Sequence, residues 1–193
     1  MNRITRRAAP FRRVLLVTVA ALSMLALAAT AAQAKVVKVT GGQATFTPSS
    51  ELTQALSSHG ITTAAIAPAT LGNDCVLSMP VIGGQVERSH LYGFLALGGG
   101  VEFSKGTHSL ALRRMAAVHR AEGSFLTANV RGERRVIARF THVTKSISGN
   151  TATLSANVVL SAEAAALINA VAHHHVVSRG APLGTANATV TVG

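Results

Sequence analysis

The strongest constraint in this sequence is an alternation of apolar and polar residues with a period of two. It is clearest at 151–160, where Ala and large aliphatic residues alternate with Thr, Ser and Asn. Successive side chains of a strand point to opposite faces, so this run predicts an antiparallel strand with one face buried and one solvated. The alternation recurs at 185–192, 125–130 and 135–140. Weaker strand patterns lie at 35–40, 43–47, 76–88, 90–97, 101–104 and 107–120.

Two segments lack this alternation and favour short helices. Residues 48–56 contain Ser caps and an early Glu and are followed by His59-Gly60, while 161–171 begin with Ser and Glu and continue with strong helix formers. Many short strands with two short helices predict an all-β fold, mainly an antiparallel sandwich or a partly closed barrel. Aromatic residues are only 4% of the chain, so its core must be built from Val, Leu and Ala.

The first 34 residues have the pattern of a secretory signal peptide. Five arginines and no acidic residue precede an apolar run, and Ala32-Gln33-Ala34 forms a small-x-small cleavage site. We therefore expect a signal-peptide helix at 1–34, a single mature domain at 35–193, and a protein that is secreted or held at the cell envelope without a transmembrane anchor. Cleavage after residue 34 would remove five arginines and lower the net charge of the chain from +11 to +6.

The residue content argues against several function classes. A single Cys excludes a disulfide framework and a four-Cys zinc site, and we find no paired carboxylates or nucleophile motif that would indicate an enzyme. Cys75 has no neighbour that would activate it, so a structural role is expected. Nucleic-acid binding is not expected either, because no aromatic residue interleaves with the basic ones.

Three residues form a candidate ligand site, namely His90, Tyr92 and His108. His90 and Tyr92 share one face of the expected strand 90–97, and His108 alternates with Leu110 and Leu112. A tyrosinate is a known axial ligand of ferric haem, and a nearby His can orient it or accept its proton. The alternative is that Tyr92 is an ordinary surface aromatic and His108 a satisfied sheet histidine.

Two other polar clusters have both a functional and a structural interpretation. On a strand, His173 and His175 would share a face, but no neighbouring carboxylate or thiolate completes a metal site, so a solvated stretch is expected. The arginines of one predicted hairpin could contact an anionic envelope polymer or could keep an exposed hairpin soluble. These arginines are Arg131, Arg134, Arg135 and Arg139.

The order of these features resembles the HtaA-like domain of exported actinobacterial proteins, some of which bind haem. The resemblance covers about residues 36–193 and rests on strand pattern and glycines. It is clearest in the segments 98–103, 106–112, 123–130, 135–140, 153–161, 164–169 and 182–184.

This resemblance implies a mostly β fold with short helices, and haem binding where the ligand residues match. Haem-binding members carry a Trp-Gly start and a Tyr in the first helical region, whereas 47–52 here contain no Tyr. The family's His also follows its strand Phe more closely than His108 follows Phe103. No ligand transfers by position, so His90 and Tyr92 are candidates on chemical grounds alone.

These observations lead to two functional hypotheses. The first is an exported module that binds haem or another apolar small ligand. The second is a structural or adhesive envelope protein without a small-molecule site.

Overall fold

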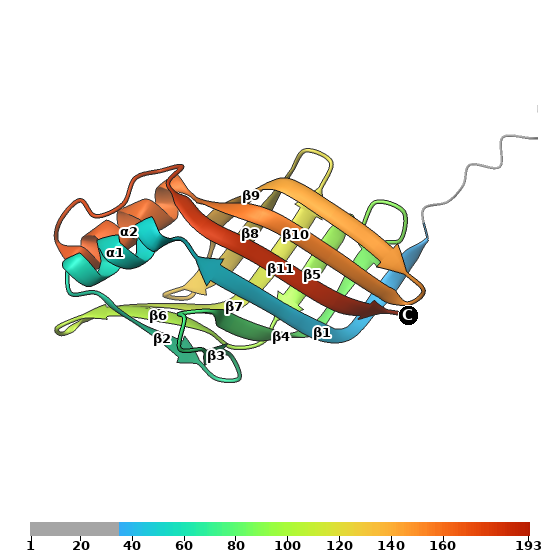
Figure 1. The fold of residues 1–193 in the computed structure, drawn as a ribbon, viewed down its shortest axis with the longest axis horizontal. Helices are drawn as coiled ribbons and strands as arrows, with labels where there is room; N and C mark the ends of the chain where they lie inside the picture. The colour runs from blue at the N-terminus through green and yellow to red at the C-terminus, as the bar shows by residue number, and fades with distance from the viewer. Residues whose placement is uncertain (1–34) are drawn as a thin grey trace, which may run out of the picture. The chain divides into compact units, whose positions relative to one another are not determined.

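The structure is a computed structural model that describes residues 35–193. One antiparallel sheet dominates it, with the strand order β2-β6-β7-β5-β4-β1-β11-β10-β9-β8 and with β3 paired to β4 (Figure 1). The strands are β1 (Val36–Pro48), β2 (Thr62–Ile66), β3 (Thr70–Leu71), β4 (Leu77–Glu87), β5 (Gly93–Leu97), β6 (Gly100–Lys105), β7 (His108–Arg120), β8 (Gly123–Val130), β9 (Glu133–Ser148), β10 (Thr151–Leu160) and β11 (Pro182–Val192).

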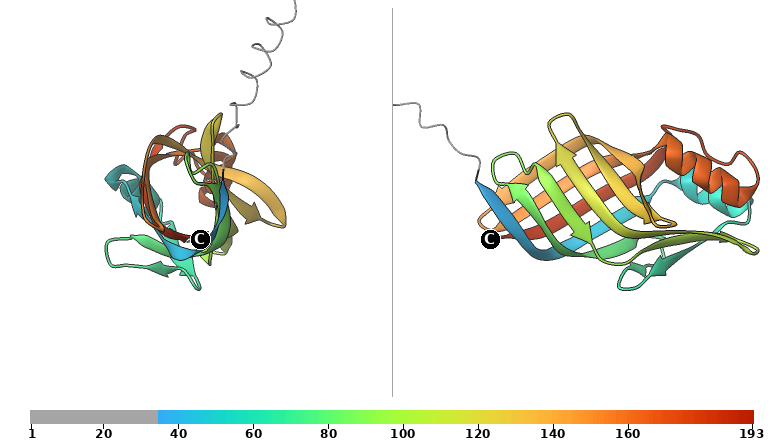
Figure 2. Two further views of the ribbon diagram at one scale, coloured as in Figure 1. Left: turned by 90° about the vertical axis from the view of Figure 1, so that its right-hand side faces the viewer. Right: turned by 180° about the vertical axis from the view of Figure 1, so that it is seen from behind.

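Pairing between β7 and β8 closes the sheet into an eight-stranded barrel of β7, β5, β4, β1, β11, β10, β9 and β8 (Figure 2). The strand β7 pairs with β8 on one edge and with β6 and then β5 on the other, and its register with β8 shifts between Arg113 and Ala116, where Arg114 has a positive φ of 48°. Its second half belongs to the barrel wall, and its first half pairs with β6. The β6–β7 hairpin therefore extends beyond the barrel.

Two helices lie at one end of the barrel, which we call the helical end. Ser49 caps the start of helix α1 (Ser50–Ser58), and Ser161 caps the start of α2 (Ala162–Ala172). The side chain of each capping serine accepts a hydrogen bond from an N–H of the first helical turn. Ser161 also donates to the carbonyl of Val136 at 2.6 Å, which fixes α2 to β9. The turns β4–β5, β7–β8 and β9–β10 lie at the opposite end, which we call the hairpin end (Figure 1).

The barrel wall follows the period-two pattern. Along β10 the residues Ala152, Val158 and Leu160 are buried, while Thr151 and Thr153 on the outer face are exposed. The buried side chains of the wall, together with Leu and Ile from the two helices, form one continuous apolar core. In the part of the chain that the structure describes, neither helix is long and apolar enough to cross a membrane.

The structure confirms the predicted mostly β fold with two short helices, and the barrel is fully closed. The strand predicted at 151–160 matches β10, and the weak patterns at 35–40 and 43–47 are one strand, β1. Strands β2 and β3 were not predicted. The predicted strand 90–97 begins only at Gly93, because residues 88–92 form the β4–β5 turn. The predicted signal peptide lies outside the described residues.

Candidate ligand-binding site

An apolar cavity of about 170 Å³ lies inside the barrel. Its walls come from the inward-facing residues of the barrel strands and from α1 and α2, including Leu52 and Ile168 at the helical end and Leu91 at the hairpin end. Leu91 is only 1% exposed although it belongs to a turn, and its φ of 56° is unusual for a leucine. The β4–β5 turn thus inserts a leucine side chain into the cavity wall.

Two of the polar residues that line this cavity, His119 and Ser124, lie at the hairpin end. His119 and Ser124 are opposite each other on β7 and β8, and Nδ1 of His119 lies 2.6 Å from Oγ of Ser124. Gly93 pairs with His119 from the other side, and a Cβ at Gly93 would lie 1.9 Å from the carbonyl oxygen of Gln85. This position therefore requires glycine, whose φ of 150° also disfavours other residues.

Tyr92 lies between two histidines at this end. Its ring stacks on His90 with a centroid distance of 5.1 Å and an interplanar angle of 10°, and its centroid is 5.1 Å from that of His119. The Nζ atom of Lys145 lies 5.3 Å from the Tyr92 ring centroid and donates a hydrogen bond of 2.7 Å to the carbonyl of His90. We call Tyr92, His90, His119 and Lys145 the rim cluster.

A carboxylate holds the turn that carries this cluster. Glu87 accepts hydrogen bonds from the hydroxyl and N–H of Ser89 and from the N–H of His90, while its other contact is Nδ1 of His90 at 3.0 Å. These bonds, above all those from Ser89, lower the pKa of Glu87 to about 2. The backbone of Glu87 also bonds to Leu91 and Tyr92, so the turn is fixed at both its ends.

The environment of His119 favours a neutral imidazole. Burial is the main cause and the positive charge of Lys145 the second, and together they lower the pKa of His119 from its usual value of 6.5. A neutral imidazole can accept a proton or a hydrogen bond at neutral pH, which a protonated one cannot.

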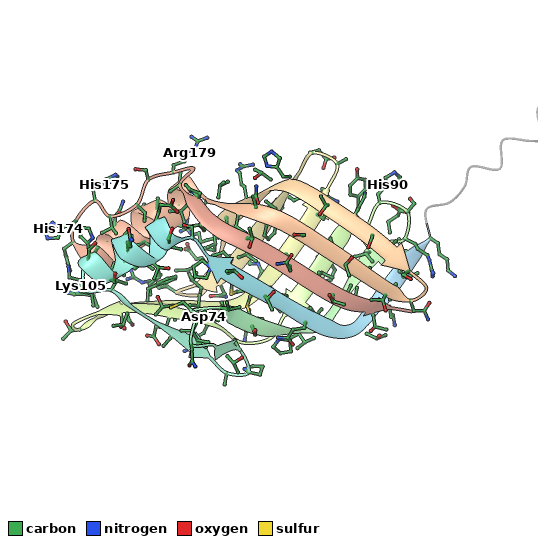
Figure 3. All side chains as sticks on the ribbon, viewed as in Figure 1. Asp74, His90, Lys105, His174, His175 and Arg179 are labelled. Atoms are coloured by element: carbon green, nitrogen blue, oxygen red, sulfur yellow. The ribbon has the colours of Figure 1, made fainter. Side chains whose placement is uncertain are left out.

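The structure brings His90 and Tyr92 together but places His108 elsewhere. His108 is paired with Lys105 in the β6–β7 hairpin, and its ring centroid is 4.4 Å from that of His173 at the end of α2. Lys105 donates a hydrogen bond to the carbonyl of Ala172 there. Figure 3 shows His90 at the hairpin end and Lys105 beside the helices. His90, Tyr92 and His108 therefore do not lie together in this structure.

The remaining polar candidates lie apart from the cavity. His173 has a left-handed φ of 57° and ends α2, so His173 and His175 do not share a strand face. Cys75 is exposed in a turn, again with a positive φ. Arg135 forms ion pairs with Glu133 and Glu163. Within residues 35–193, no group of three or more His, Cys, Asp or Glu side chains is placed to hold a metal ion.

The fold is similar to those of solved structures of HtaA and HtaB from Corynebacterium glutamicum. The C-terminal domain of HtaA from Corynebacterium glutamicum matches with a TM-score of 0.64 and 16% identity, over 81% of this chain and 99% of that domain. The heme binding protein HtaB from the same organism matches with a TM-score of 0.57 and 13% identity, over 82% of this chain and 96% of HtaB. A domain-swapped dimer of an HtaA C-terminal domain variant matches with a TM-score of 0.51 and 17% identity, over 69% of this chain and 84% of that one.

These comparisons confirm the HtaA-like fold. At the level of sequence, no family profile matches the chain and no curated protein is significantly similar to it. The fold is therefore shared where the sequence has diverged widely.

Proposed function

We propose that this protein is an exported, non-catalytic module that binds haem at the hairpin end of its barrel, with Tyr92 as the residue that contacts the iron. The observation that carries the proposal is the rim cluster, in which the chain's only tyrosine is enclosed by two imidazoles and a lysine. Support also comes from the shared fold with HtaB, which is described as a heme binding protein.

The donor set at the rim fits a ferric haem. A tyrosinate supplies an anionic oxygen ligand for ferric iron, and the Nζ atom of Lys145 lies 5.3 Å from the Tyr92 ring centroid. Burial lowers the pKa of His119 and so favours its neutral form, and its ring centroid lies 5.1 Å from that of Tyr92. The adjacent Phe94 is 43% exposed on the outer wall and offers apolar surface beside Tyr92. When bound, haem would supply the iron centre, and the protein's residues would hold and orient it.

The size of the barrel interior supports a haem position outside it. The cavity of about 170 Å³ is smaller than the ~300–1,000 Å³ of pockets for drug-sized ligands. Haem would therefore lie against the rim cluster, with one face toward solvent. Export follows from the predicted signal peptide at 1–34 and would bring the module to the cell envelope or the medium.

A haemin titration of the exported protein tests this proposal. We expect a saturable Soret shift, and we expect Tyr92→Phe to weaken haemin binding at least ~tenfold because the anionic ligand is lost. His108→Ala is the matched control, since His108 lies at the helical end, and it should leave the titration unchanged. Absence of a Soret shift, or a shift that Tyr92→Phe leaves intact, would contradict the proposal.

The outer wall favours a second candidate function, adhesion to the envelope. Strands β10 and β11 contain no charged residue, and their outer faces form cross-strand rows of hydroxyls and amides such as Ser155–Asn187 and Thr153–Thr189. Such a surface can hydrogen-bond to neutral polymers. The test is sedimentation of the protein with purified cell-wall particles, where Thr153→Asp should reduce binding if this wall is adhesive and should have no effect otherwise.

A further inference from the structure

The barrel cavity exists because small side chains occupy much of the inner wall. Eight strands enclose a space that side chains can just fill or that can hold one small ligand. Here Ala44 on β1, Ala186 and Ala188 on β11 and Ala156 on β10 are neighbours in register and all line the cavity. Their methyl groups leave the middle of the barrel unfilled. An apolar cavity of roughly 150 Å³ stays free of water and accepts apolar guests, and this cavity is of similar size.

The cavity is long and narrow. Its lining on β11 runs from Leu183 to Ala188, which corresponds to about 17 Å along the strand and, at the usual strand tilt, about 13 Å along the barrel axis. A volume of about 170 Å³ spread over that length leaves a slim cross-section. A linear aliphatic chain matches this shape, whereas a fused ring system does not.

The cation of Lys145 does not itself line the cavity but lies near its hairpin end, close enough to His119 to lower the pKa of that cavity-lining residue. Lys145 faces Leu154 in the β9–β10 pairing, next to the polar cavity residues His119 and Ser124. Within residues 35–193 Lys145 forms no ion pair, and the nearby Glu87 carboxylate is bonded to Ser89 and His90. An unpaired cation at the polar end of an apolar cavity complements an anionic head group attached to an apolar chain.

We propose that the barrel interior is a second site, which adjoins the haem site at the rim and shares Lys145 and His119 with it, and which binds a single-chain amphiphile with an anionic head group. The aliphatic chain fills the cavity along the barrel axis toward Ile168 at the helical end. The head group lies at the hairpin end, where Lys145 neutralises it and the hydrogen-bonded pair of His119 and Ser124 donates its one free hydrogen to it. Leu91 closes the cavity at that end and is displaced when the chain enters.

Calorimetric titration of the exported protein with three probes tests the site. Dodecanoate and dodecyl phosphate carry the anionic head on the same chain and distinguish a carboxylate from a phosphate source, while dodecanol lacks the charge. We expect saturable binding of at least one anionic probe. Lys145→Gln should weaken that binding roughly fivefold and leave dodecanol binding unchanged. Equal affinity of the variant and the original protein for every anionic probe would overturn the role of Lys145 and with it the proposal.

A cavity-filling variant tests the location of the chain. Ala186→Leu places a larger side chain in the middle of the cavity and should weaken all three probes more than ~tenfold, because it occupies the volume the chain needs. Thr185→Leu, one residue away on the exposed outer face, is the matched control and should have no effect. Unchanged binding to folded Ala186→Leu, or no saturable binding to the original protein, would overturn the proposal. If Ala186→Leu does not fold, the Lys145→Gln comparison decides.

The haem and amphiphile sites can fail independently. Tyr92→Phe is expected to remove the Soret shift and to leave dodecanoate binding intact, because Tyr92 does not line the cavity. Loss of dodecanoate binding in Ala186→Leu with an unchanged Soret titration would support the interior site alone.

Discussion

The two ends of the barrel are built on different principles. At the helical end, aliphatic residues of α1 and α2 pack onto the core, and capping serines satisfy the helix starts. At the hairpin end, one carboxylate holds a short turn, and the two rings of that turn, His90 and Tyr92, meet titratable side chains from β7 and β9. The helical end thus supplies stability, while the hairpin end collects the groups that can bind a ligand.

The largest difference between the ends should appear in unfolding free energy. Ile168→Ala removes buried aliphatic volume at the helical end, where the side chain is 5% exposed, and should cost about 3 kcal/mol. Lys145→Ala at the hairpin end should cost less than about 1 kcal/mol. Urea unfolding measures both, with Ala166→Ser on the exposed face of α2 as the neutral control. Equal losses of unfolding free energy in Ile168→Ala and Lys145→Ala would contradict this difference between the two ends.

A smaller difference in unfolding free energy is expected between the capping serines of the two helices. Ser161 is buried, and its hydroxyl both caps α2 and bonds to β9, so Ser161→Ala should cost about 1–2 kcal/mol. Ser49 caps α1 at a more exposed position with longer bonds of 3.2 Å, and Ser49→Ala should cost about 0.5–1 kcal/mol. The two values come from the same unfolding assay, and a larger loss at Ser49 would contradict this order.

The smallest effect, which should disappear in acid, is expected at the hairpin end. The Glu87 carboxyl titrates near 4.5 in an unfolded chain and near 2 in the folded one. Its stabilisation is therefore complete above about pH 4.5 and is lost as the pH falls toward 2. Glu87→Gln lacks this contribution, so the melting temperatures of the variant and the original protein should differ most above pH 4.5 and converge toward pH 2. A difference that is independent of pH would show that Glu87 acts by packing alone.

Most of the barrel could be predicted from the sequence because its signals are local. The alternation in 151–160 gives β10 with its bounds, and Ser161 with the following helix formers gives α2. Closure could not be predicted, because it depends on the pairing of β7 with β8 after the bend at Arg114. Nothing in the local pattern shows that β7 pairs with β5 and β8 in the barrel and also with β6 in the projecting hairpin.

Only two of the four residues of the rim cluster could be predicted from the sequence. His90 and Tyr92 are two residues apart and could be found by inspection, although they lie in a turn and not in the expected strand. His119 and Lys145 come from β7 and β9, and only the folded barrel brings them to Tyr92. The alternation around His119, with Ala117 and Met115 on the same face, was the one signal that it points inward. His108 has the same kind of alternation but belongs to the projecting part of β7.

Closure of the sheet also explains how the outer wall of β10 and β11 can lack charge. An open sheet exposes unpaired backbone groups along its margins, and lysines there discourage other chains from adding to it. In the closed ring both of these strands have a partner on each side along their length. At this wall the pairing of both strand edges, and not surface charge, prevents other chains from adding to the sheet. Its outer side chains are therefore not needed for that protection and are available to change during evolution.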